Sequence, residues 1–227
     1  MPTETDWADR LPIVQQLAAP IRRIPILPAV VLCGLVIGVL AILGILQRTV
    51  HPEWIAANLD SESSAGKWVG SGLLWAAAGV WFLVAATGAS ARPWVWIWWP
   101  MLAWLAADEG NAFHERIERW LEVDWQILYA PLIVVTAISW WGVLRAHRRP
   151  RKVALLLILG AGAWAIPLVL ELIQNWGGEP IEAALYDPMM ITEEILEMIG
   201  AAVFFIAGLM VLKGDPAHPH TLLMGCA

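Results

Sequence analysis

Six stretches of about 20 residues are predominantly apolar, and each is long enough to cross a membrane as a helix. The whole chain is 59% hydrophobic and only 15% charged, whereas soluble domains carry about 25% charged residues. The sequence therefore predicts an all-α integral membrane bundle of six transmembrane helices. The six predicted spans are 26–46, 68–88, 94–113, 126–145, 153–176 and 189–212.

The predicted six-span domain covers residues 24–213, with a short segment at each end. In the N-terminal segment, residues 1–23, we expect residues 6–19 to form either an interfacial helix or a tail without fixed structure. Residues 214–227 are expected to be a flexible tail. Asp187 and Pro188 suit the N-cap and first position of the last span.

Lysine and arginine predict the orientation of the bundle. Six spans place both termini on one side, and that side holds ten of the 14 lysines and arginines. Because basic loops stay inside, we expect cytoplasmic termini in a plasma (inner) membrane. Sixteen of the 20 acidic residues then lie outside or in the outer half of a span. Such a surface favours cations and argues against nucleic acid as a partner.

An acidic motif follows the third span. Residues 94–105 are free of charge, and Asp108, Glu109, His114 and Glu115 come directly after them. If the helix continues, Asp108, Asn111, Glu115 and Glu118 share one face, with His114 beside it. Ionisable groups at such a depth are costly and usually mark a functional site.

The fifth and sixth spans carry acidic residues at a similar depth. A rise of about 1.5 Å per residue places Asp108, Glu171, Glu193 and Glu197 roughly 21 to 30 Å above the inner boundary. All of them then lie in the outer third of a hydrocarbon core about 30 Å thick. We therefore expect three helices to bring their carboxylates into one enclosed pocket.

Buried carboxylates need protons or counter-ions. Only two nearby arginines, Arg116 and Arg119, are available for pairing, so a divalent metal ion is favoured and protonation comes second. Zn, Mn, Fe and Ca all fit these side chains, but the two Glu-x-x-His motifs of a di-iron site are absent from the sequence. The predicted metal ligands are Asp108, Glu109, His114, Glu115, Glu171, Glu193 and Glu197.

Structural explanations exist for several of these residues. A helix N-terminus attracts acidic side chains such as Glu193 through its dipole. Glu115 can lie on a solvated helix end beside Arg116 and Arg119, and His114 can be a hydrogen-bonded interfacial histidine. Asp108 and Glu171 are least suited to such explanations, because both follow long apolar runs.

The motif Asp108-Glu109-x4-His114-Glu115, with Glu193, Glu194 and Glu197 in the last span, resembles a family of uncharacterised bacterial polytopic membrane proteins. That resemblance implies no activity. From the residues we expect an outward-facing site that binds a divalent cation, and they leave open whether the site is catalytic. If it is, metal-dependent hydrolysis of a lipid or small substrate at the outer leaflet is the natural chemistry. The alternative is an accessory subunit of a respiratory, photosynthetic or transport complex. Besides the lipid bilayer, its partners would then be other membrane subunits or further copies of the chain. The tryptophan-rich third span and the glycine-bearing first span would be the docking faces for other helices or pigments.

Overall fold

The structure is a computed structural model that describes residues 12–59, 61, 64–88, 93–123, 125–148, 151–175 and 183–214. These residues form eight α-helices and one short 3-10 helix, η2, without a β-strand. The elements are α1 (Pro12–Arg22), α2 (Ile26–Thr49), η2 (Ile55–Ala57), α3 (Ala65–Ala86), α4 (Pro93–Asn111), α5 (Phe113–Leu121), α6 (Trp125–Ala146), α7 (Arg151–Asn175) and α8 (Ala183–Lys213).

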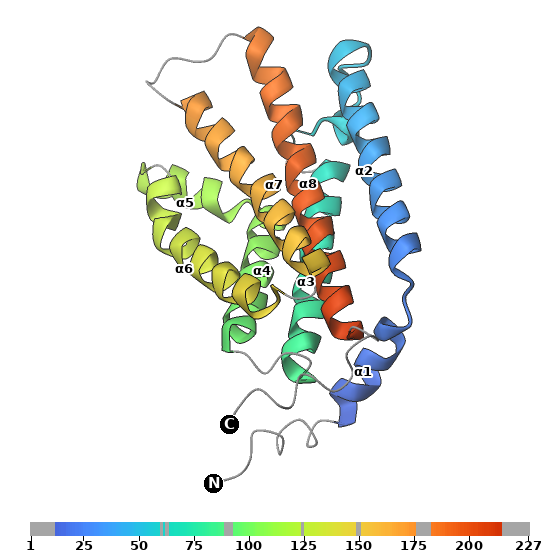
Figure 1. Cartoon of the computed structure of the whole chain (residues 1–227). Helices are drawn as coiled ribbons and strands as arrows, with labels where there is room; N and C mark the ends of the chain where they lie inside the picture. The colour runs from blue at the N-terminus through green and yellow to red at the C-terminus, as the bar shows by residue number, and fades with distance from the viewer. Residues whose placement is uncertain are drawn as a thin grey trace.

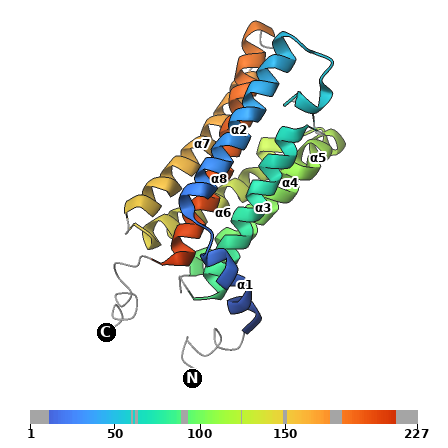
Figure 2. The same ribbon diagram turned by 90° about the vertical axis from the view of Figure 1, so that its right-hand side faces the viewer.

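The long helices α2, α3, α4, α6, α7 and α8 run alternately up and down a bundle (Figure 1). We call the end where α2, α4 and α7 finish the acidic end, and the opposite end the basic end. Figure 2 shows α1 at the basic end, where α8 also finishes at Lys213. At the acidic end, Arg48 of α2 pairs with Asp187 of α8 at 3.3 Å.

The core lies where α3, α4 and α8 pack together. Trp81 of α3 is fully buried and donates a hydrogen bond from Nε1 to the carbonyl oxygen of Phe204 at 3.0 Å. Trp98 of α4 packs edge-on against the Phe204 ring, with centroids 5.1 Å apart. Gly208 leaves room for Trp81, because a Cβ there would lie 3.1 Å from its Nε1. These contacts fix α4, which carries Asp108 and Glu109, against α8, which carries Glu193, Glu194 and Glu197.

Five helices are long and apolar enough to cross a membrane: α2, α3, α6, α7 and α8. Their outward side chains suit a lipid environment, as on α2, where Leu27, Leu32 and Leu35 are each more than 60% exposed. The helix α4 is not among the five. These properties support the predicted multi-pass membrane protein.

The structure corrects the predicted start of the last span. The helix α8 begins at Ala183 and includes Pro188, so Asp187 lies inside the helix and is not its cap. In the N-terminal segment, α1 includes Pro20, and Val14 is buried in the core shared with α3 and α8. Residues 1–11 and 215–227, the remaining parts of the two predicted end segments, lie outside the described residues.

Candidate functional site

A sharp corner separates α4 from α5, where the sequence predicted one continuous helix. Ala112 adopts a left-handed conformation (φ 48°), and α5 starts in a new direction immediately after it. Asp108 then accepts a hydrogen bond from the backbone N–H of His114 at 2.9 Å, which stabilises the start of α5. The predicted shared face for Asp108, Asn111, Glu115 and Glu118 is therefore wrong, because the helix ends at Asn111.

The same corner brings the His114 imidazole back onto Asp108. Its Nδ1 lies 2.8 Å from Asp108 Oδ2, and the hydroxyl of Tyr129 on α6 donates to Asp108 Oδ1 at 3.0 Å. The ring of Trp125 lies 5.1 Å from that of His114, and its Nε1 donates to Glu171 of α7 at 2.5 Å. Asp108 is only 8% exposed, so its carboxylate meets His114 and Tyr129 largely out of contact with solvent.

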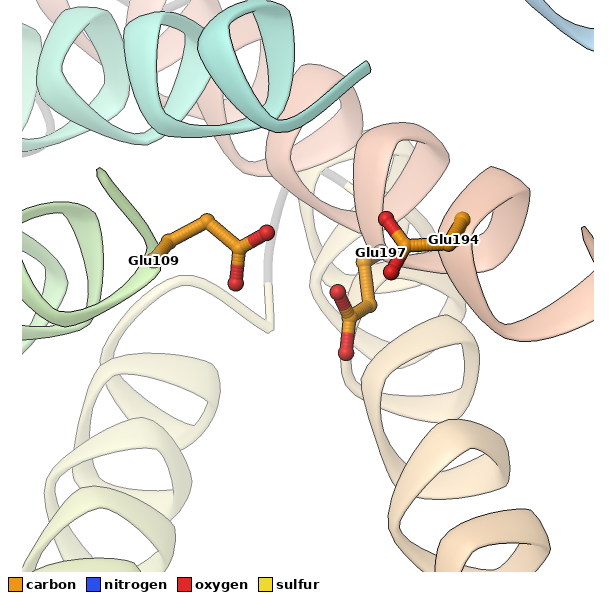
Figure 3. Close-up of side chains that lie close together, drawn as sticks. All are labelled: Glu109, Glu194 and Glu197. Carbon is orange, nitrogen blue, oxygen red and sulfur yellow. The ribbon is translucent and has the colours of Figure 1, made fainter. Parts of the chain in front are cut away.

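A second group of carboxylates joins α4 to α8. Glu109, Glu194 and Glu197 each offer an oxygen, and these oxygens lie within 4.8 Å of one another. Figure 3 shows Glu109 extending from α4 toward the two glutamates of α8. Gly70 of α3 lies beside Glu109, since a Cβ there would be in ordinary contact with Glu109 Oε1 at 3.8 Å.

Lys67 lies between these carboxylates, and the sequence analysis missed it. Its Nζ lies 3.2 Å from Glu109 and 2.9 Å from Glu194, and its side chain is only 15% exposed. Ser64 caps α3 by accepting a hydrogen bond from the Lys67 backbone N–H at 3.1 Å, so Lys67 belongs to the first turn of α3. The sequence contained one usable signal, a lysine three residues after a capping serine at the acidic end.

All seven predicted ligands line one cavity of about 900 Å³, together with Lys67 and Glu194. As their predicted depth suggested, Asp108, Glu171 and Glu197 line the same cavity, although they belong to three helices. Asn111, which the sequence placed on the same face as Asp108, instead donates to the Ala107 carbonyl at 2.7 Å. His51 lies on the surface, where it pairs with Glu53.

The electrostatics of His114 reflect these neighbours. Burial disfavours the charged imidazole, but the hydrogen bond and negative charge of Asp108 outweigh burial and raise the pKa of His114 above its ordinary value. Lys67 lowers the pKa of His114 and Glu171 raises it by smaller amounts. The Asp108–His114 pair is thus set to hold a proton at Nδ1, which leaves Nε2 as the ring nitrogen for contacts in the cavity.

The arrangement suits cation binding and acid–base chemistry. Three carboxylates within 4.8 Å can share a divalent ion. A histidine held by a carboxylate at one ring nitrogen is the usual partner of such ions and also a common general base.

The chain was compared with protein families, curated proteins and solved structures. No curated protein and no solved structure is significantly similar to it. Residues 24–212 match one family, described as a domain of unknown function (DUF8692). This match covers the bundle from α2 to α8 and includes every residue that lines the cavity. The chain therefore belongs to the DUF8692 family.

Proposed function

We propose that this chain is a six-span membrane protein whose acidic end faces the outside. In this proposal α4 crosses the membrane with the five apolar helices, and both termini are cytoplasmic. The distribution of basic residues supports this orientation, because basic segments stay in the cytoplasm. Among the described residues, seven lysines and arginines lie at the basic end and four at the acidic end.

The proposed activity is divalent-cation binding by Glu109, Glu194 and Glu197, with hydrolysis of a substrate in the cavity. One observation carries this proposal: three carboxylates from two helices have oxygen atoms within 4.8 Å of one another, and all three line a cavity of about 900 Å³. Ionised carboxylates in such a place repel one another unless a cation or protons compensate them. Lys67 supplies one positive charge for seven lining carboxylates, so a further cation has room in the charge balance.

In this proposed mechanism the other polar residues that line the cavity also have roles. Glu109, Glu194 and Glu197 would hold the divalent ion, which would supply a more acidic water molecule and polarise the bond to be cleaved. His114 accepts a proton at Nε2, while Asp108 holds its other nitrogen and fixes the ring orientation. Tyr129 and the backbone of His114 hold Asp108 in turn. Glu115, Glu171 and Glu193 line the cavity and add negative potential that attracts the cation.

Metal analysis of the purified protein tests the proposal. The wild type should retain a divalent metal in stoichiometric amount after dialysis, and Glu194→Gln and Glu197→Gln should each lose most of it. Glu118→Gln is the matched control, because Glu118 follows the corner in α5 and does not line the cavity. Equal metal content in all four proteins, or none in the wild type, would refute the cation site.

A second candidate, a non-catalytic membrane subunit, is favoured by Lys67. Its ion pairs satisfy Glu109 and Glu194 without any metal, as a purely structural network requires. The outer face of α2, where a Cβ at Gly34 or Gly38 would meet nothing within 4 Å, is suited to a neighbouring helix. Purification in a larger assembly, without metal, is the result that this candidate predicts.

A further inference from the structure

Below the carboxylates, the cavity changes from polar to apolar. Its deeper walls come from α6 and α7, with Ile133 and Ala137 on one side and Ile158, Ala161 and Leu168 on the other. The two helices are close at their connection and diverge toward the acidic end (Figures 1 and 2). A polar end and an apolar end in one cavity match an amphiphile better than a small polar solute.

Two hydrogen bonds between α6 and α7 define the length of this apolar slot. Trp125 donates to Glu171 near the acidic end, and Trp140 donates to the Leu157 carbonyl at 2.9 Å near the basic end. The 15 residues from Trp125 to Trp140 rise ~22 Å along α6. One leaflet of a 30 Å hydrocarbon core is ~15 Å deep, so the slot has room for a single acyl chain of ordinary length.

The charge of the polar end limits the head group. Seven carboxylates line the cavity, and Lys67 is the sole lysine or arginine among its described lining residues. Acidic side chains therefore outnumber the basic groups Lys67 and His114 among the described lining residues. An anionic head group would be repelled there, whereas an uncharged or cationic head group would not.

We propose that the cavity binds a single-chain amphiphile with an uncharged or cationic head group. The head lies among the carboxylates and Lys67, and the chain lies in the slot between α6 and α7. This inference rests on the proposed function in that it names the substrate class of the same site. The apolar slot and the carboxylates are separate groups of residues, so each can be changed without the other.

Photo-crosslinking in detergent micelles tests the inference. The probe is hexadecylamine with a diazirine on its chain, and hexadecyl sulfate with the same diazirine is the anionic counterpart. Gly162→Phe fills the slot, since Gly162 lines the cavity and a Cβ there meets nothing within 4 Å. Gly34→Phe is the matched control on α2, because a Cβ at Gly34 also meets nothing within 4 Å and Gly34 does not line this cavity.

The amine probe should label α6 and α7, and unlabelled hexadecylamine should compete with it. Labelling should fall by about tenfold in Gly162→Phe, because the phenyl ring takes up space that the probe's chain would occupy. Exclusion of about two methylene groups of the chain from burial changes affinity by roughly that factor. Gly34→Phe should be labelled like the wild type, and the sulfate probe should label α6 and α7 weakly.

Equal labelling of Gly162→Phe and wild type, or equal labelling by amine and sulfate, would overturn the inference. Metal content measured in the same preparations separates the two proposals. If metal is retained but specific labelling is not seen, the proposed amphiphile binding is refuted and the proposed cation site is not. Specific labelling without metal sinks the cation site and leaves the amphiphile slot supported.

Discussion

At the scale of single residues, Lys67 is the group that compensates the negative charge of the carboxylates Glu109 and Glu194. Its ammonium contacts Glu109 and Glu194 and is largely buried with them. Removing one partner of a buried ion pair typically costs about 3–5 kcal/mol, because the other charge is left uncompensated. We therefore expect Lys67→Met to lower the melting temperature strongly in the presence of a chelator.

Added divalent metal should restore much of that loss, because a cation at the three glutamates replaces the missing charge. Thermal unfolding in detergent, with chelator and then with metal, measures both effects. Lys152→Met is the matched control, since Lys152 is exposed at the basic end of the bundle. A melting temperature in Lys67→Met that is low and insensitive to metal would count against the cation site.

His114 gives a pH-dependent prediction. Its pKa is raised in the folded protein by Asp108, so protonated His114 contributes stability that is fully present below about pH 6.5. This contribution is lost as the pH rises through the raised pKa. The difference in melting temperature between wild type and His114→Gln should therefore be largest at low pH and shrink as the solution becomes alkaline.

Melting curves of the chelated protein from about pH 5 to pH 9, which bracket the ordinary pKa of histidine, provide the measurement. His51→Gln is the control, because His51 pairs with Glu53 on the exposed surface. A difference for His114→Gln that grows with rising pH contradicts the assigned role of Asp108.

At the scale of helices, the close approach of α3 and α4 positions Glu109. Ser71 donates to the Ala106 carbonyl at 2.8 Å, and a Cβ at Gly110 would lie 2.8 Å from the Ser71 hydroxyl oxygen. A larger residue at Gly110 must push the two helices apart beside the site. Overpacking of this kind typically costs about 1–3 kcal/mol.

We expect Gly110→Val to lower both the melting temperature and the retained metal. Gly72→Val provides the comparison within α3, because a Cβ at Gly72 meets nothing within 4 Å. Unfolding curves and metal analysis of the two variants measure the effect. Similar values for both would show that the α3–α4 spacing does not matter to the site.

The helices themselves were largely predictable, and their ends were less so. The predicted spans 26–46, 126–145 and 153–176 lie within three residues of α2, α6 and α7, because long apolar runs have clear limits. The corner at Ala112 was missed, because a left-handed non-glycine residue is held there by contacts such as that between His114 and Asp108. Lys67 was missed because its partners lie on other helices.

At the scale of the whole molecule, depth along each span could be predicted from the sequence and placed the acidic residues at one level, because helical rise per residue is nearly constant. It could not divide them into the Asp108–His114 pair and the group of Glu109, Glu194 and Glu197. That division depends on rotation about each helix axis, which depth alone does not contain.

The orientation of the bundle can be tested with cysteine labelling. In a background of Cys33→Ala and Cys226→Ala, we expect Glu118→Cys to react with an impermeant maleimide on intact cells. Arg148→Cys, at the basic end, should react only after the cells are opened. The reverse pattern would place the acidic end, and with it the cavity mouth, in the cytoplasm.

The ion pairs of Lys67 with Glu109 and Glu194 also have a consequence for insertion of the protein into the membrane. A cluster of bare carboxylates would make membrane insertion dependent on metal supply, because the charges would need compensation during assembly. Here the chain brings its own counter-ion, in the first turn of α3. If the site binds a cation as proposed, the protein can be inserted without that cation, which can then bind later.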